Sequence, residues 1–160
     1  MLQEKTKPTA AQTAAVKTVV QPYLFFNGRC EEAVAFYKKS LGAEIEMLMH
    51  FKDNPDQESM KDGCPGGPVN PDWVMHTTLK IGESQIMASD GMPGQPSGFQ
   101  GFSLSLTAPT VAQCDRWFNA LADGGQVQVP LAKSFFAERF GCVADKFGVS
   151  WMVIVPPAQA

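Results

Sequence analysis

Three side chains in this 160-residue chain could move a proton or hold an anion, and they are His76, Asp90 and Glu138. An imidazole changes charge near neutral pH, so His76 is a candidate general base or a hydrogen-bond donor to an anionic ligand. Asp90 stands before Gly91, and Glu138 stands before Arg139. Each of the three also has a structural interpretation: a hydrogen-bonded histidine, a carboxylate that caps a turn, and a solvated ion pair at a sheet edge.

Other reactive groups give no recognisable constellation. The four cysteines are widely spaced without a C-x-x-C pattern. Cys30 and Cys114 fall on the apolar faces of two predicted helices, which predicts small buried side chains rather than catalytic thiols. His50 and His76 lack the H-x-H or H-x-x-x-H spacing of a metal site. No glycine-rich segment between a strand and a helix would cradle a nucleoside cofactor.

The elements that must position these residues occur as one unit present twice. An apolar strand at 23–26 leads into an amphipathic helix at 30–41, and a strand at 102–106 leads into a helix at 110–123. The aromatic pairs Phe36-Tyr37 and Trp117-Phe118 are 81 residues apart, one in each helix. A repeat of this size predicts two copies of one supersecondary unit with a site between them.

Apolar residues at helical spacing predict which helix faces are buried. The predicted stripes are Cys30, Ala33, Val34, Tyr37 and Leu41 in the first helix, and Val111, Cys114, Phe118 and Leu121 in the second. Gly42 is placed to end the first helix, and Thr110 with Gln113 fits the capping pattern that begins the second.

Three strands are predicted after each helix, at 43–51, 73–81 and 84–89 in the first half and at 126–131, 137–144 and 149–155 in the second. Each half therefore reads strand–helix–strand–strand–strand, over about 21–90 and 99–156. The segment 52–71 is rich in Gly, Pro and Asp, and a connection of that length is either a lid or cleft rim, or a surface insertion. Residues 1–20 read as a flexible tail.

Several segments resemble a known family in order and spacing. They are 21–28, 32–33, 36–37, 41–44, 87–90, 116–118, 145–149 and 151–152. Together they resemble the PhnB-like branch of the vicinal oxygen chelate superfamily, which includes glyoxalase I, bleomycin resistance proteins and extradiol dioxygenases. The resemblance implies an α+β fold over 21–157. Two tandem βαβββ units would form a curved eight-stranded sheet arrangement around a cleft, with the helices on the convex face.

Strand parity then predicts the side chains that line the cleft. They are Gln21, Tyr23, Phe25, His76, Thr78, Met87, Ser89, Ser103, Ser150 and Met152. By the same parity Phe102 is expected in the core. Trp73, Phe135 and Phe136 would either stack on a planar ligand or pack in the core.

Metal-binding relatives in this superfamily use one ligand from each of four strands. Carried over by motif, those positions are Gln21, Met87, Gly101 and Met152. A glycine offers no ligand, and thioethers do not suit hard or borderline divalent ions. We therefore expect no metal and no other cofactor. A divalent metal held elsewhere, for example by His76 with Asp90, is the alternative.

The net charge of −3 gives no reason to expect nucleic acid as a partner, and no apolar run is long enough to span a membrane. We expect a cytoplasmic, homodimeric small-molecule-binding protein. The alternatives are a lyase, isomerase or dioxygenase-type enzyme acting on a small oxygenated or phosphonate-type substrate, and a drug-sequestering resistance protein. The demethylubiquinone methyltransferase label given to members of this branch finds no support in the residues.

Overall fold

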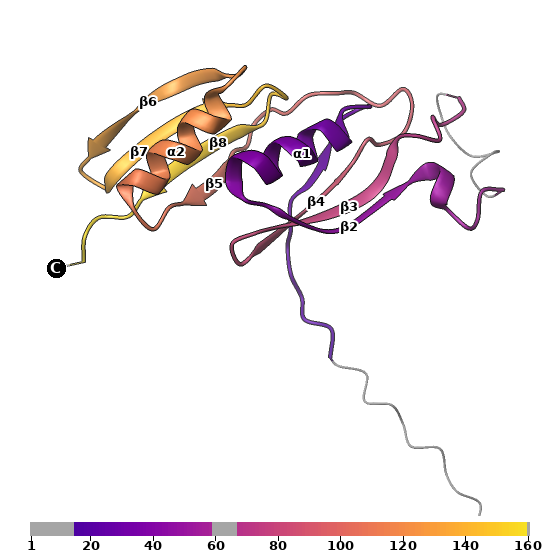
Figure 1. Ribbon diagram of the computed structural model, residues 1–160, viewed down its shortest axis with the longest axis horizontal. Coiled ribbons are helices and arrows are strands. Elements are labelled where there is room, and N and C mark those ends of the chain that lie inside the picture. Colours follow the sequence, from indigo (N-terminus) through magenta and orange to yellow (C-terminus); the bar gives the residue numbers. More distant parts are fainter. Residues whose placement is uncertain (1–14, 59–66, 160) are drawn as a thin grey trace, which may run out of the picture.

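Two β–α–β–β–β units follow one another in the computed structural model, which describes residues 15–58 and 67–159 (Figure 1). The first unit consists of β1 (Tyr23–Phe25), α1 (Cys30–Leu41), β2 (Glu44–His50), β3 (Val74–Ile81) and β4 (Ser84–Ser89), with a short 3₁₀ turn at Phe51–Asp53. The second consists of β5 (Leu104–Thr107), α2 (Val111–Ala122), β6 (Gln126–Ser134), β7 (Ala137–Ala144) and β8 (Ser150–Val155).

Each unit folds into a four-stranded sheet with the same strand order. The first sheet, sheet A, has the order β1-β4-β3-β2, and the second, sheet B, has the order β5-β8-β7-β6. In both sheets the first strand of the unit pairs in parallel with the last, and the other pairs are antiparallel. The predicted α+β fold of two tandem βαβββ units with eight strands is confirmed.

The two helices are equivalent in length and sequence position. Each has 12 residues, and the aromatic pairs Phe36-Tyr37 and Trp117-Phe118 occupy the seventh and eighth positions of α1 and α2. Helix α1 ends at Gly42, whose N–H donates to the Lys38 carbonyl. The Thr110 hydroxyl accepts a hydrogen bond from the Gln113 N–H at the start of α2 (3.1 Å).

Each helix covers one face of its sheet and buries its apolar stripe there (Figure 1). All five residues of the predicted stripe of α1 are buried, as are Cys114, Phe118 and Leu121 of α2. The prediction is wrong for Val111, which is 42% exposed. It is the first residue of α2, so no preceding helical turn covers it.

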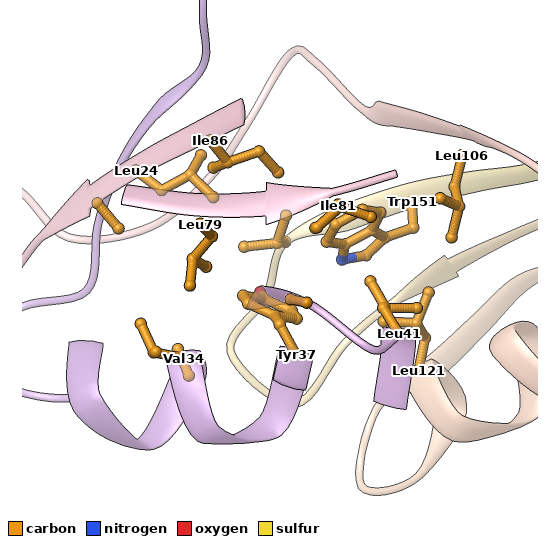
Figure 2. Close-up of a cluster of buried hydrophobic side chains, with 14 of the residues drawn as sticks. Leu24, Val34, Tyr37, Leu41, Leu79, Ile81, Ile86, Leu106, Leu121 and Trp151 are labelled. Atoms are coloured by element: carbon orange, nitrogen blue, oxygen red, sulfur yellow. The ribbon is translucent and has the colours of Figure 1, made fainter. Parts of the chain in front are cut away.

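A buried carboxylate joins the two units. Asp145, in the turn between β7 and β8, accepts hydrogen bonds from the Tyr37 hydroxyl (2.6 Å) and from the Trp151 indole N–H (2.9 Å). Tyr37 belongs to α1 and Trp151 to β8, and their rings lie 5.5 Å apart in one apolar cluster (Figure 2). Burial, and secondly the charge of Asp145, raises the pKa of Tyr37 well above its usual value.

The aromatic residues outside the stripes differ from expectation. Phe102 is 45% exposed because it precedes β5 and is not part of the strand, so its predicted place in the core is wrong. Phe135 is 99% exposed and Phe136 41% exposed, because β6 runs to Ser134 and both residues form the tip of the β6–β7 hairpin. Trp73 is half-buried.

Two expectations fall partly outside the described residues. Of the predicted tail, residues 15–20 are exposed and carry no helix or strand, and residues 1–14 lie outside the described part of the chain. Of the connection at 52–71, residues 59–66 lie outside it.

Candidate functional site

The face of each sheet that turns away from its helix carries the predicted cleft residues. In sheet A, the strand register aligns Tyr23, Met87, Thr78 and Met47 in one row across all four strands. The neighbouring row, Leu24, Ala88 and Thr77, is buried under the helix. We call the row of Tyr23, together with Phe25 and His76, the open face of sheet A.

Sheet B has an equivalent row. Ser105, Met152, Cys142 and Val129 align across β5, β8, β7 and β6. This row, with Phe140, is the open face of sheet B. Matching Met87 to Met152 makes Tyr23 equivalent to Ser105, Thr78 to Cys142 and Met47 to Val129.

A tyrosine–histidine pair stands on the open face of sheet A. The Tyr23 hydroxyl lies 2.7 Å from His76 Nδ1, and the two rings are 5.5 Å apart. Thr78 Oγ1 lies 3.5 Å from the other ring nitrogen, Nε2. Phe25 stacks against Tyr23 with ring centroids 5.1 Å apart. The sheet brings together residues of β1 and β3, which are far apart in the sequence.

Either atom of this hydrogen bond can be the donor. Burial, with a smaller contribution from Cys30, raises the pKa of Tyr23. The phenol donates to Nδ1 when the imidazole carries its proton on Nε2, and it accepts from Nδ1 in the other tautomer. In the first tautomer His76 offers an N–H donor at Nε2, on the side of Thr78.

Asp90 is fully engaged by backbone groups. One carboxylate oxygen accepts from the N–H groups of Gly28 (2.7 Å) and Cys30 (2.8 Å), and the other accepts from Val74 N–H (2.8 Å). The residue is only 4% exposed. These bonds hold the start of α1 against β3, so Asp90 has a structural role here.

Ser89 and Glu138 are also held by protein partners. The Ser89 hydroxyl donates to the Val74 carbonyl and accepts from Gly91 N–H, and Ser89 is 3% exposed. It therefore has no free hydroxyl surface for a ligand. Glu138 forms an exposed ion pair with Lys133 (3.4 Å), away from the tyrosine–histidine pair.

The remaining polar cleft residues form two hydrogen-bonded chains, one in each unit. In the first, Gln21 Nε2 donates to Gln85 Oε1 (2.9 Å), and Gln85 Nε2 donates to Glu46 (2.7 Å). In the second, the Ser103 and Ser150 hydroxyls lie 2.7 Å apart, and Ser150 donates to Gln128 Oε1 (3.1 Å).

The two hydrogen-bonded chains use equivalent positions of the two units. Glu46 and Gln128 each lie at a register shift, between Ile45 and Met47 in β2 and between Val127 and Val129 in β6. The same alignment of the units makes Gln21 equivalent to Ser103 and Gln85 to Ser150. The family position carried over to Gly101 is therefore better assigned to Ser103, two residues later. The sequence did not reveal Glu46 or Gln128, because a β-bulge leaves no clear local pattern. Gln85 was missed although it has the same strand parity as the predicted cleft residue Met87.

The donor set on the open faces does not fit the divalent metal of glyoxalase-type relatives. Around Met87 and Met152 the neighbouring groups are mostly hydroxyls, amides and thioethers, and the imidazole of His76, the carboxylate of Glu46 and the thiol of Cys142 are divided between the two sheets. Such a site needs three or four carboxylate, imidazole or thiolate ligands that converge on one point. Among residues 15–58 and 67–159, no group of three or more His, Cys, Asp or Glu side chains is placed to hold a metal ion.

A groove of about 750 Å³ lies beside the two hydrogen-bonded chains of side chains, between the β3–β4 hairpin and β5. Gln21 and Gln85 line it from the first unit, and Ser103 and Ser105 line it from the second. Its apolar lining includes Leu41 and Trp117. Within the described chain, no helix is long and apolar enough to cross a membrane.

The family model of 3-demethylubiquinone-9 3-methyltransferase matches residues 18–154. Protein YjdN of Escherichia coli (strain K12) is 38% identical over 142 residues, which cover 88% of this chain and 97% of that protein. Protein PA1353 from Pseudomonas aeruginosa is 40% identical, and its crystal structure superposes with a TM-score of 0.76 over 88% of this chain and 98% of that one.

A putative 3-demethylubiquinone-9 3-methyltransferase, PhnB protein, from Bacillus cereus is 28% identical, with a TM-score of 0.71 over 86% of this chain and 99% of that chain. In fold alone, the chain is also similar to a glyoxylase/bleomycin resistance protein/dioxygenase domain from Frankia sp. EAN1pec (12% identity, TM-score 0.56, 89% of this chain and 99% of that chain). By its sequence, this chain belongs to the PhnB-like family described as 3-demethylubiquinone-9 3-methyltransferase, and its fold is similar to that of a glyoxylase/bleomycin resistance protein/dioxygenase domain.

Proposed function

We propose that this protein binds a small oxygenated organic molecule on the open face of sheet A, without a divalent metal. The observation that carries the proposal is the tyrosine–histidine pair, in which the Tyr23 hydroxyl and His76 Nδ1 lie 2.7 Å apart. With the phenol as the donor, the imidazole presents an N–H donor at Nε2. A donor fixed by a neighbour needs little reorganisation when a ligand binds.

The surroundings of the pair suit a ligand with a flat apolar body. Tyr23 and Phe25 are 39% and 46% exposed, and Met47 is 41% exposed beside them. Methionine side chains adapt their shape and make favourable contacts with aromatic rings. An aromatic or unsaturated ligand with an oxygen atom near Nε2 would satisfy both features.

We also propose that the protein is a homodimer, because a second copy would cover the apolar residues of the open faces. Exposed apolar patches of this kind mark interaction surfaces. We further propose that the protein acts in the cytoplasm.

The same pair supports a second candidate, an enzyme that transfers a proton. If an acidic C–H or O–H group of the ligand took the place of the Tyr23 phenol at Nδ1, His76 would be the base and Tyr23 the acid. The ligand-binding experiment below is followed by a deuterium-exchange measurement on the bound ligand, and exchange that depends on His76 supports the enzyme.

The binding test uses phenylphosphonate and benzoate as probes, titrated while the His76 imidazole resonances are followed by NMR. We expect His76→Ala to weaken binding about tenfold, as for the loss of a hydrogen bond to a charged group. Tyr23→Phe should weaken it less. His50→Ala is the matched control, because His50 lies at the end of β2 beside Glu31 (3.2 Å) and Asp53 (3.4 Å). Equal affinities in the His76 and His50 variants would refute the site.

A further inference from the structure

We propose that the groove between the β3–β4 hairpin and β5 is a second binding site, and that it takes a small organic amine with an apolar body. The groove is separate from the tyrosine–histidine pair, since neither Tyr23 nor His76 lines it. Its volume of about 750 Å³ lies in the range of small-molecule sites.

The hydrogen-bonded chain of the first unit ends on an acceptor at the groove. Glu46 can only accept, so Gln85 must present its amide N–H₂ to it and its carbonyl oxygen to Gln21. Gln21 in turn donates its Nε2 to Gln85. The direction of the whole chain is thus fixed by one carboxylate. Gln21 Oε1 is left as an acceptor with no partner among the described residues.

The hydrogen-bonded chain of the second unit also ends on an acceptor at the groove. Ser150 has one hydroxyl proton, and it donates that proton to Gln128 Oε1. The bond between the two serines therefore runs from the Ser103 hydroxyl to Ser150 Oγ. The lone pairs of Ser103 Oγ are left at the groove, where Ser103 forms part of the lining. Both sides of the groove consequently present acceptors.

Charge points to the same class of ligand. The described lining contains no lysine or arginine, and its charged residue is Glu83, with Glu46 directly behind Gln85. Leu41, Ile81 and Trp117 supply an apolar surface between the polar sides. A protonated amine donates up to three hydrogen bonds and is favoured by nearby carboxylates, whereas an anion would be repelled by Glu83 and would meet the acceptors Gln21 Oε1 and Ser103 Oγ.

The experiment titrates the full chain with 2-phenylethylammonium and, as the matched probe of opposite charge, 3-phenylpropionate. Binding is followed by ¹H–¹⁵N NMR at the side-chain amides of Gln21 and Gln85. We expect saturable shifts with the amine and none with the carboxylate. Ser103→Ala and Gln21→Leu should each weaken amine binding about fivefold, the effect of one hydrogen bond.

Matched controls are Ser40→Ala and Gln113→Leu, which change the same residue types on the helices and should leave amine affinity unchanged. Glu46→Gln tests the fixed direction of the first chain, since an amide at position 46 would let Gln85 reverse. It should weaken amine binding although Glu46 is not part of the groove lining.

Two results would overturn the proposal. One is amine affinity that falls with His76→Ala but not with Ser103→Ala, which would place the amine on the open face of sheet A. The other is absence of amine shifts in folded wild-type protein, including the case in which a second copy fills the groove. Because phenylphosphonate binding at His76 is measured separately, failure of either site leaves the other result intact.

Discussion

At the residue scale, the acidic side chains of this protein differ in how many protein groups donate hydrogen bonds to them. Asp90 and Asp145 are buried and accept from three and four protein donors, respectively. Glu138 is half-buried and has one exposed lysine partner. The first two carboxylates organise backbone and aromatic groups, and this role explains why they tolerate burial.

Replacing Asp90 with alanine should lower the free energy of unfolding by about 3 kcal/mol, because three backbone N–H groups lose their acceptor. Denaturant unfolding followed by circular dichroism measures this change. Glu138→Gln serves as the surface control and should change stability by less than about 0.5 kcal/mol. Equal stability of the two variants would contradict the assigned role of Asp90.

The Tyr37–Asp145 bond predicts a dependence of stability on alkaline pH. The pKa of Tyr37 is raised in the folded protein, whereas an unfolded tyrosine titrates near pH 10. The contribution is therefore fully present below about pH 10 and is lost as pH rises further, because the unfolded state then releases a proton that the folded state retains.

We expect Tyr37→Phe to be less stable than wild type by about 1–3 kcal/mol at pH 8, the value of a hydrogen bond to a charged group. The difference should shrink steadily between pH 9 and about pH 11. Urea unfolding of both proteins across this pH range measures it. A constant difference would mean that the Tyr37 hydroxyl titrates alike in both states.

At the scale of elements, close backbone contact fixes how β6 follows α2. A Cβ atom on Gly125 would lie 2.2 Å from the Ala144 carbonyl oxygen and 3.0 Å from the Asp145 Cα. Gly42, which ends α1, needs a positive φ of 68° but has open space around it.

Gly125→Ala should therefore be much more destabilising than Gly42→Ala. The second substitution carries only the strain of a left-handed residue, about 1–2 kcal/mol. The first forces β6 away from β7, so we expect a loss greater than about 3 kcal/mol or failure to fold. Thermal unfolding of the two variants compares them, and similar melting temperatures would argue against the contact.

The sequence predicted the elements better than it predicted their contacts. The buried stripe of α1 was predicted completely, because a 3.6-residue period survives in any single helix. The pairing of Tyr23 with His76 depends on β1 and β3 lying two strands apart in sheet A, and no local pattern encodes that distance. The bulges that add Glu46 and Gln128 to the polar chains were missed for the same reason.

At the scale of the whole molecule, each chain leaves apolar side chains uncovered on both open faces. Phe25 and Met47 on sheet A and Val129 on sheet B are between 41% and 46% exposed. Light scattering should therefore give about twice the chain mass of 17.4 kDa at micromolar concentration.

Val129→Asp should shift this equilibrium towards the monomer, because it places a charge in the proposed interface. Val111→Asp is the matched control: Val111 is 42% exposed against 43% for Val129, but it lies at the start of α2 on the other side of the sheet. If both variants keep the mass of the wild type, or if the wild type is a monomer, the open faces do not form the dimer interface.

The alignment of the two units has a consequence for how specificity could diverge. A symmetric pair of identical half-length chains would have to present the same groups twice, so a change in one would always appear in both. Covalent linkage removes that constraint. Here Tyr23, His76 and Glu46 correspond to Ser105, Phe140 and Gln128. At these three positions the first unit has every ionisable group and the second has none. The linked chain therefore places different chemical groups at equivalent positions of two similar units.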